Sequence, residues 1–398
     1  MISAQDARTT ILGAVCPLEH ITISLERSLN SVLAEDIVAA ENIPPFDNAA
    51  MDGFAVKSEN IQRVPCVLKI VGEIAAGIVA SKELQSGEAM SIMTGAKIPS
   101  GCDAVVQQEW VEKKDGERVT IIKPVNKGHN IRSAGADIQS GATVLQAGRR
   151  LRPQEIGVLA SLGRQFIEVH RRPCVAILAT GNEIVEIDTP LTEAKIRNSN
   201  AYTLAALVKE LDCEVMNLGI ARDDRNELKQ KIMEGLGADL LITTGGVSVG
   251  KYDLVIDVLK EIGAEIKFWK VNIKPGMPLM FALFNSIPIF GLPGNPVSSL
   301  VTFLQFVKPA LQKVMGQKFT DARYKIQAKL DHEIRKNDGK RHFVRGILES
   351  KNGALRVRST GSQISNILSS LAKANCLIIL PEELEYVGAG EEVEVELL

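Results

Sequence analysis

The sequence predicts a multidomain protein of mixed α/β and β class, with a central doubly wound α/β domain and two β-rich units. Its 398 residues exceed the roughly 250–300 at which a single hydrophobic core stops growing, so we expect more than one domain. Strand-like and helix-like segments alternate over residues 172–316, which is typical of a parallel sheet covered by helices. Short strand-like runs separated by turn residues dominate residues 60–150 and the stretch after residue 320.

The first expected element is a helix over residues 3–16, because apolar residues recur there at helical spacing and Ser3 suits the N-cap. The first β-rich unit contains short runs such as PCVLKIVGEI and ERVTIIKP. The segment KKDGER predicts a hairpin with Asp115 and Gly116 at its turn. After residue 320 the helical patterns stop, and runs such as HFVRGIL and NCLIILP predict a small antiparallel barrel or sandwich.

In the central domain the apolar runs CVAILAT, EVMNLG and ADLLITT predict buried strands, and a further strand ends at LPGNP. The helices between them are NAYTLAALVKEL, DDRNELKQKIMEGLG, DLVIDVLKEIG and PVSSLVTFLQFV. Ligands of doubly wound sheets bind beyond the carboxyl ends of the strands. We therefore expect Glu183, Asp223 and Asp253 on one rim, together with the loop GGVSVG that begins at Gly245 and the loop LPGNP.

These rim residues also have structural interpretations. Asp223, Asp224 or Asp253 could cap a helix, and capping is the better interpretation for a single aspartate at a helix start. The loop GGVSVG is neither a Walker loop nor GxGxxG, so alone it is a weak phosphate signal. Its place between a buried strand and a helix favours an anion, because glycines let the anion approach backbone N–H groups.

Two lysines, Lys270 and Lys274, frame the segment KVNIKPGMP. In an extended strand, positions four apart face the same side, so the pair suits a bound oxyanion, although a solvated strand face is equally compatible. The carboxylates without His or Cys partners favour Mg²⁺ over zinc. From the residues alone we infer an enzyme that handles a nucleotide or phosphate with an acidic Mg²⁺ site.

Composition excludes several classes of protein. Net charge is −2, from 46 basic and 48 acidic residues, which argues against a general nucleic-acid binder. Six scattered cysteines without metal-ligand spacing indicate reduced thiols in a cytoplasmic protein. We expect no secretory signal, because the first residues lack a basic segment, and no membrane association, because no apolar run approaches ~18 residues.

Several motifs occur in one order along nearly the whole chain: PPFDNAAMDGFAV, IMTGAKIPSGCDAVVQQE, RSAGADI, ILATGNEI, TTGGVSVGKYD, KVNIKPGMP, GLPGNPVSS, GKRHFVRG and GSQISNILSS. Together they resemble the molybdopterin molybdenumtransferase family, which includes MoeA and the gephyrin E domain. The chain departs from the usual family residues at Ala49, Phe54, Asn182, Asn198 and Thr244.

The resemblance implies the last step of molybdenum cofactor biosynthesis. Adenylylated molybdopterin and molybdate would be the substrates, Mg²⁺ would assist, and AMP would be released. It also implies four domains: a linking domain from residues 1–27 and 141–171, an inserted β-rich domain from 28–140, the molybdopterin-binding α/β domain from 172–318, and a C-terminal β barrel from 319–398. Family members are homodimers with a cleft between two subunits, so we expect a homodimer here.

The resemblance also carries site residues over to this chain. From its residues alone, segment 44–56 is a packed connection, but the family's matching loop carries an active-site aspartate, here Asp52. The implied catalytic residues are Asp52, Thr94, Asp137, Glu183, Asp223 and Asp253, the last two as Mg²⁺ ligands. The implied substrate contacts are Gly245, Gly246, Ser248, Gly250, Lys270, Lys274, Pro293, Pro296, Arg345 and Ser365, of which Arg345, Ser365 and the lysines would hold molybdate.

Two alternatives of other classes remain. One is molybdopterin adenylyltransferase, whose single domain is similar to the α/β domain here; the flanking units argue against it. The other is a non-catalytic scaffold of the gephyrin type; retention of the acids and lysines argues against it. Partners beyond a second copy would be molybdopterin adenylyltransferase and proteins that mature molybdenum enzymes, with no nucleic acid and no membrane.

Overall fold

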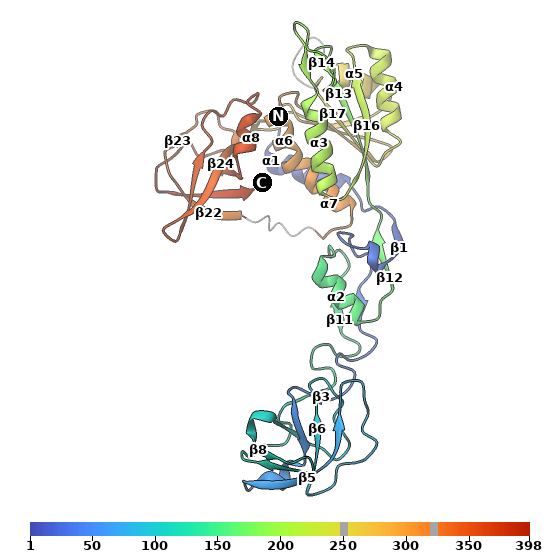
Figure 1. Cartoon of the computed structure of the whole chain (residues 1–398). Helices are drawn as coiled ribbons and strands as arrows, with labels where there is room; N and C mark the ends of the chain where they lie inside the picture. The colour runs from blue at the N-terminus through green and yellow to red at the C-terminus, as the bar shows by residue number, and fades with distance from the viewer. Residues whose placement is uncertain (247–253, 319–324) are drawn as a thin grey trace.

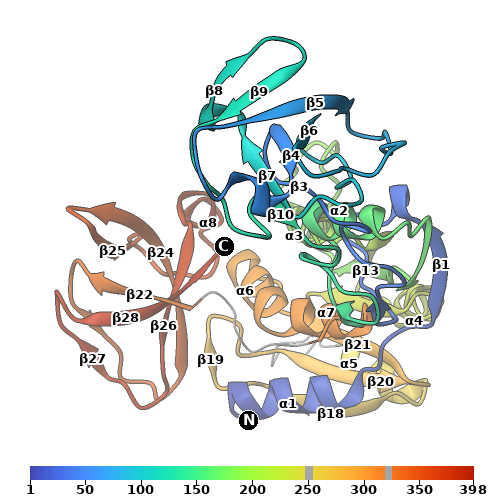
Figure 2. The ribbon, with the colours of Figure 1, turned by 90° about the horizontal axis from the view of Figure 1, so that it is seen from below.

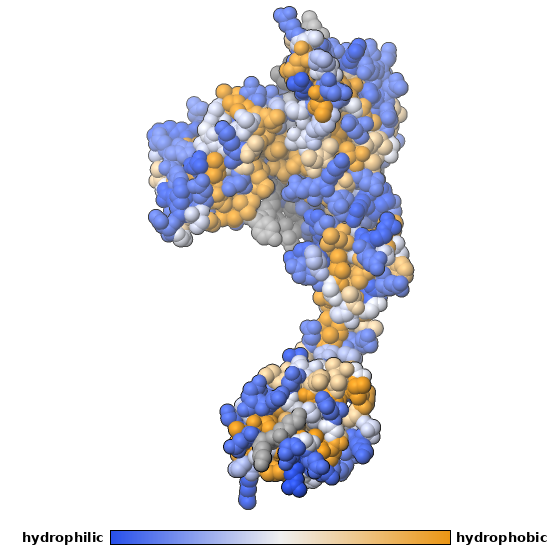
Figure 3. All heavy atoms as spheres, in the orientation of Figure 1, coloured by the Kyte–Doolittle hydropathy of each residue, from blue (hydrophilic) through white to orange (hydrophobic). Residues whose placement is uncertain are grey.

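The protein is elongated and built from four units. A computed structural model describes residues 1–246, 254–318 and 325–398. Figure 1 shows the α/β unit at one end with the C-terminal barrel beside it, a slender linking unit in the middle, and a β-module at the other end. The space-filling view shows that only a narrow neck joins the β-module to the rest (Figure 3). No helix among the described residues is long and apolar enough to cross a membrane.

The chain reaches the β-module and returns from it along three successive two-stranded antiparallel ladders. The pairs are β1 (His20–Ser24) with β12 (Phe166–His170), β2 (Ile37–Val38) with β11 (Thr143–Leu145), and β3 (Asn48–Ala49) with β10 (Ile131–Arg132). Helix α2 (Pro153–Ser161) packs against them around a small apolar core that includes Leu33, Leu159 and Ile167. The β-module is therefore an insertion, and its two connections run side by side.

The β-module is a six-stranded sheet in the order β7-β4-β6-β5-β9-β8. Its strands are β4 (Gly53–Val56), β5 (Cys66–Ile74), β6 (Glu88–Ile92), β7 (Ala104–Gln107), β8 (Val111–Lys114) and β9 (Arg118–Ile121). The module also contains 3₁₀ helices at Ser58–Ile61 and Gln108–Trp110, and another, Leu25–Arg27, follows β1 in the linking unit. The expected hairpin joins β8 to β9: Gly116 has a φ of +90°, and Asp115 Oδ1 accepts from the N–H groups of Glu117 and Arg118.

Helix α1 (Ala4–Ala14) is capped by Ser3, as expected, because the Ser3 hydroxyl accepts from the Asp6 N–H. Its buried face contacts the core of the α/β unit. Strand β1 pairs with β12, whereas α1 packs against the α/β unit. The grouping of residues 1–27 with 141–171 in one domain stays a prediction.

The α/β unit contains a six-stranded sheet in the order β16-β13-β17-β21-β20-β18. Its strands are β13 (Cys174–Thr180), β16 (Glu214–Ala221), β17 (Leu240–Thr244), β18 (Glu265–Trp269), β20 (Met280–Phe284) and β21 (Ile287–Leu292). Its helices are α3 (Ser199–Glu210), α4 (Arg225–Gly235), α5 (Leu254–Glu261), α6 (Pro296–Thr302) and α7 (Lys308–Val314), with a π-helical turn at Phe303–Val307. We expected a parallel sheet, but the observed sheet is mixed, because β20 runs antiparallel to both of its neighbours.

Alternation along the strands explains how helices cover both faces of this sheet. Val175 and Ile177 of β13 belong to a core shared with α1, α3, α6 and α7, whereas Ala176 and Leu178 belong to a second core shared with α4 and α5. Successive side chains of a strand point to opposite faces, so a continuous apolar run serves both layers. Figure 2 shows the helices on the two sides of the sheet.

The C-terminal unit is a barrel, because its strands pair in a closed circle β24-β25-β22-β28-β26 and back to β24. The strands are β22 (Lys325–Leu330), β24 (Arg341–Lys351), β25 (Ala354–Ser359), β26 (Cys376–Leu380) and β28 (Glu392–Leu397), with a small ladder of β23 (Ile334–Arg335) and β27 (Tyr386–Val387). The expectation that helices stop after residue 320 was wrong in one place: α8 (Ser369–Lys373) is a short helix. Phe343, Leu377 and Ile379 join the barrel to the core of the α/β unit.

Candidate active site

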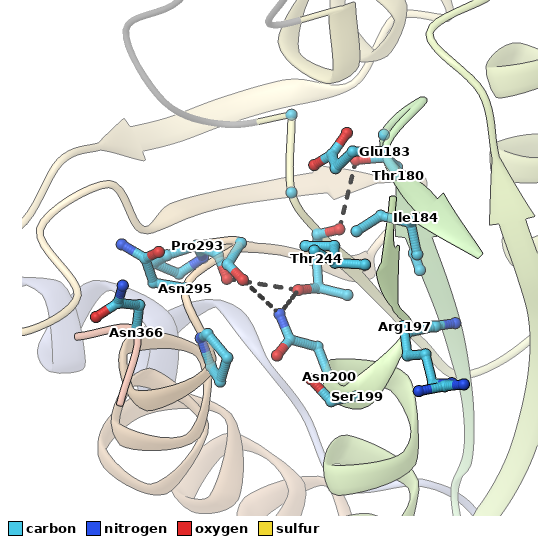
Figure 4. A pocket seen from close by; sticks show the side chains of 18 of the residues that line it. Thr180, Glu183, Ile184, Arg197, Ser199, Asn200, Thr244, Pro293, Asn295 and Asn366 are labelled. Carbon is cyan, nitrogen blue, oxygen red and sulfur yellow. Dashed lines mark hydrogen bonds between the residues drawn. The ribbon is translucent and has the colours of Figure 1, made fainter. Parts of the chain in front are cut away.

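A cavity of about 780 Å³ lies at the carboxyl edge of the α/β sheet. The parallel strands β13, β16, β17 and β21 all end at this edge, where doubly wound folds bind ligands. The predicted residues that line it are Glu183, Asp223, Gly245, Gly246, Pro293 and Pro296. Figure 4 shows Glu183 and Thr180 on one side, Asn200 below, and Asn295 with Asn366 at the far end. The strand ends therefore bring six predicted residues to one cavity.

Two acids of this cavity come from neighbouring strand ends. Asp223 follows β16, and Glu183 follows β13. Asn182 ties the two ends together: its N–H donates to Asp223 Oδ2 over 3.3 Å, and its Oδ1 accepts from the Asp223 N–H over 3.2 Å. The helix cap is the next residue, because Asp224 accepts from two N–H groups of α4. Capping is therefore not what Asp223 does; Asp223 is instead one of the residues that line the cavity.

The strand β17 runs directly into the glycine loop. Gly245 has a φ of +94°, and a Cβ there would lie 2.6 Å from the Thr180 carbonyl oxygen. Gly246 also has a positive φ, of +65°. Only glycine satisfies both the backbone angle and the close approach at residue 245. The rest of this loop lies outside the described residues, and with it the predicted Ser248, Gly250 and Asp253.

Sequence reasoning did not select the polar residues that hold the strand ends together. Asn200, in the first turn of α3, donates from Nδ2 to Thr244 Oγ1 over 2.9 Å and to the Gly294 carbonyl oxygen over 2.8 Å (Figure 4). It thereby joins the end of β17 to the loop after β21. Asn295, Arg197 and Asn366 line the cavity as well. The segment RNSN, residues 197–200, is a polar cluster where α3 begins, and this is the signal that could have indicated Asn200.

Arg345 and Ser365 belong to the C-terminal unit, and neither is among the residues that line the cavity, although Asn366, next to Ser365, is. Ser365 accepts from Asn295 Nδ2 over 3.0 Å. Arg345 is fully buried and donates from Nη2 to the carbonyl oxygens of Ser362 and Ile364, which fixes the loop that carries Ser365. Burial lowers the pKa of the Arg345 guanidinium. Its Nε and Nη1 are buried without a hydrogen-bond partner among the described residues.

The lysines do not lie on one extended strand, so the geometric basis of that prediction was wrong. Strand β18 ends at Trp269, and Lys270 has a φ of +76°, which turns the chain. Lys270 Nζ lies 4.2 Å from the centre of the Trp269 ring. Lys274 belongs to β19 (Ile273–Lys274), which pairs with the barrel strand β24. Neither lysine lines the cavity, whose lining in this region is Pro278.

The remaining predicted residues lie on the β-module or its neck. Asp52 Oδ1 accepts from the Thr94 N–H over 2.7 Å and from the Thr94 hydroxyl over 2.8 Å. The backbone bond from Thr94, with the hydroxyl bond, lowers the pKa of Asp52. Asp137 is exposed, and its N–H donates to the Ile43 carbonyl oxygen. Figure 1 shows that the linking unit separates the β-module from the α/β unit of the same chain.

The described residues contain no cluster of three or more His, Cys, Asp or Glu side chains that could hold a metal. Mg²⁺ commonly uses one or two carboxylates, several waters and substrate phosphates. Asp223 and Glu183, with the amide oxygen of Asn182 beside them, are donors of the required kind.

Comparison with protein families accounts for nearly the whole chain. Residues 2–163 match the MoeA N-terminal region (domain I and II), and residues 176–313 match the probable molybdopterin binding domain. Residues 327–398 match the MoeA C-terminal region (domain IV). The second range corresponds to the α/β unit of the structure, and the third corresponds to the barrel.

Relatives of known name extend the match to full length. Molybdopterin molybdenumtransferase of Haemophilus influenzae is 38% identical and covers 100% of this chain and 98% of its own. The Staphylococcus aureus (strain COL) enzyme of that name is 36% identical, with 100% and 95% covered. The crystal structure of the molybdopterin biosynthesis moeA protein of Pyrococcus horikoshii OT3 has a TM-score of 0.86, with 31% identity and both chains covered completely. The chain belongs to the MoeA family of molybdopterin molybdenumtransferases.

Proposed function

We propose that this transferase inserts molybdenum from molybdate into adenylylated molybdopterin and releases AMP, in the last step of molybdenum cofactor biosynthesis. Relatives named for molybdenum transfer to molybdopterin match it over its full length, which supports a role in this biosynthesis. The observation that carries the finer proposal is the cavity of about 780 Å³ with carboxylates and glycine-bearing strand ends at one edge. Such a site can hold an extended substrate with a pyrophosphate group.

Asp223 and Glu183 are the described residues that would hold Mg²⁺, with the substrate pyrophosphate as the further ligand. When bound there, Mg²⁺ would neutralise negative charge on the pyrophosphate as AMP departs. The Asn182 bonds keep the Asp223 carboxylate at the cavity edge. Gly245 and Gly246 line the cavity at the end of β17, and the absence of side chains there lets Thr180 and Val255 pack close to the backbone. Asp253, the other predicted ligand, lies outside the described residues.

Molybdate is a tetrahedral dianion, so its site needs cationic and hydroxyl donors. Arg345, Lys270, Lys274 and Ser365 are the donors that we propose. The buried Nε and Nη1 of Arg345 support this proposal, since buried donors without partners are rare and suit an anion. The Asn295 bond keeps Ser365 beside the cavity, so molybdate would be delivered next to the organic substrate.

A second copy of the chain completes the proposed site. Asp52, Thr94 and Asp137 belong to the β-module and neck, and the linking unit keeps the module away from the cavity of its own chain. In a homodimer the module of one subunit can instead close over the α/β unit of the other. The hydrogen bonds from Thr94 hold Asp52 ionised and oriented for that contact.

The experiment that tests this function is a turnover assay with purified protein, adenylylated molybdopterin, molybdate and Mg²⁺. We expect AMP release that requires both molybdate and Mg²⁺, measured by chromatography, and molybdenum bound to the pterin product. Formation of pyrophosphate from ATP and molybdopterin would instead identify a molybdopterin adenylyltransferase. Absence of both reactions would contradict an enzymatic function and favour a scaffold.

A further inference from the structure

A chain of three side chains crosses the joint between the α/β unit and the barrel. Lys274 Nζ lies 3.1 Å from Asp338 Oδ2, and Asp338 Oδ1 lies 2.8 Å from His342 Nε2. Lys274 belongs to the α/β unit, whereas Asp338 and His342 belong to the barrel. The Asp338 carboxylate therefore contacts both Lys274, which we propose as a molybdate contact, and His342.

Backbone contacts hold this joint independently of the ion pair. Strand β19 pairs in parallel with the start of β24, with Lys274 opposite His342. Asn272 Nδ2 donates to the Gly339 carbonyl oxygen over 2.8 Å, and the Arg341 N–H donates to the Asn272 carbonyl oxygen over 3.1 Å. The position of Asp338 relative to the Lys274 backbone is therefore fixed even without the charge on Asp338.

The three side chains differ strongly in exposure. The Lys274 side chain is 60% exposed, that of Asp338 24% and that of His342 12%. Burial alone would raise the pKa of Asp338, but the hydrogen bonds from His342 and Lys274 lower it to about 2. Asp338 is therefore a fixed negative charge at neutral pH, beside the end of a long and mostly exposed side chain.

An ammonium group has three N–H donors, so Lys274 can contact Asp338 and still donate to an anion. A free lysine side chain loses rotamer freedom when it binds a ligand, and holding it in place beforehand reduces that cost. We infer that Asp338 is a positioning residue that holds the Lys274 ammonium where it binds molybdate, with His342 holding Asp338. This inference rests on the proposed function, because it takes Lys274 as a molybdate contact.

The test is titration calorimetry of the full-length protein with sodium molybdate, comparing wild type with Asp338→Asn. The substitution keeps the size of the side chain and removes its charge. Exposed ion pairs contribute up to ~1 kcal/mol, so we expect the molybdate Kd to rise about three- to fivefold. The matched control is Glu394→Gln, which removes the carboxylate of the ion pair Lys325–Glu394, 3.0 Å long and in the same barrel. It should leave the Kd unchanged.

A double-mutant cycle separates positioning from a merely structural role. In a Lys274→Met background, Asp338→Asn should cause no further loss of molybdate affinity, because the side chain it positions is gone. An equal loss in both backgrounds would overturn the inference. An unchanged Kd in Asp338→Asn would also overturn it, and a lower Kd would show that Asp338 competes with the anion for Lys274.

Failure of the inference and failure of the proposed function give different results. If the wild-type protein does not bind molybdate, the proposed oxyanion site and the inference both fall. If it binds molybdate and Asp338→Asn binds equally well with an unchanged melting temperature, only the inference falls. In the AMP-release assay, a positioning role requires Asp338→Asn to raise the half-maximal molybdate concentration without a change in pterin affinity.

Discussion

Single residues that look alike in the sequence have different surroundings in the structure. Asp223 and Asp224 are adjacent acids after the same strand, yet Asp224 caps α4 while Asp223 lines the cavity. Sequence patterns could not separate them, because both lie at a strand end and before a helix. The reciprocal bonds with Asn182, which depend on how two strand ends meet, make the difference.

This pair of neighbours provides a matched test of the proposed Mg²⁺ site. Asp223→Asn would remove a charged ligand of that proposed site, so Mg²⁺-dependent AMP release should fall by roughly 10- to 100-fold. Asp224→Asn retains an effective capping residue and should leave the rate nearly unchanged. Rates are measured over a Mg²⁺ series, with the melting temperature of each variant as a control for folding. Equal rates in both variants would remove Asp223 from the metal site.

The contact between Asp52 and Thr94 predicts a change in pH dependence. The two bonds from Thr94 lower the pKa of Asp52, so its carboxylate persists to lower pH than an ordinary aspartate. Thr94→Ala removes the hydroxyl bond, so the pKa of Asp52 should rise and the acid limb of the AMP-release profile should move to higher pH. Thr94→Ser keeps the hydroxyl and should keep the wild-type profile. Identical profiles for the two variants would show that the ionisation of Asp52 does not limit the rate.

At the scale of helices, strands and turns, the features that could be predicted from the sequence are those that depend on nearby residues. The cap of α1 by Ser3 and the hairpin turn at Asp115 were predicted correctly, because each depends on contacts within a few residues. The reversal of β20 and the turn at Lys270 were not predicted. They depend on which strand lies next to which, and on a left-handed backbone conformation that an ordinary lysine does not signal.

Among the elements at the cavity, the end of β17 gives the sharpest prediction. Gly245→Ala forces a Cβ to within 2.6 Å of the Thr180 carbonyl oxygen, so the strand ends must shift. We expect AMP release to fall roughly tenfold or more, since small displacements of a site are costly. Gly263→Ala is the matched control: its φ of +88° carries a similar backbone cost of roughly 1–2 kcal/mol, but nothing lies within 4 Å of the new Cβ.

Unfolding by urea shows whether both alanine variants lose similar stability, and the assay shows whether only Gly245→Ala loses activity. A rate for Gly245→Ala as high as for Gly263→Ala would show that the close approach at Thr180 does not matter for catalysis.

At the scale of the whole molecule, the predicted site residues are divided between the cavity of the α/β unit and the β-module. Six predicted residues meet in one cavity, while Asp52 and Thr94 lie on a module beyond three ladders and a neck. The strand-end residues could be predicted because parallel strands end at a common edge. The buried place of Arg345 and the links made by Asn200 could not, because they depend on contacts between distant segments.

Mixed dimers test this arrangement most directly. Chains carrying Asp52→Asn and chains carrying Asp223→Asn, each with a different affinity tag, are co-expressed, and the heterodimer is purified through both tags. If the β-module of one subunit serves the cavity of the other, one of the two clefts contains both wild-type acids and the other contains neither. Molybdate-dependent AMP release by the heterodimer should then be about half that of the wild-type dimer, while each mutant homodimer stays nearly inactive. A purified heterodimer as inactive as the homodimers would contradict the account, because both acids would then have to come from the same chain.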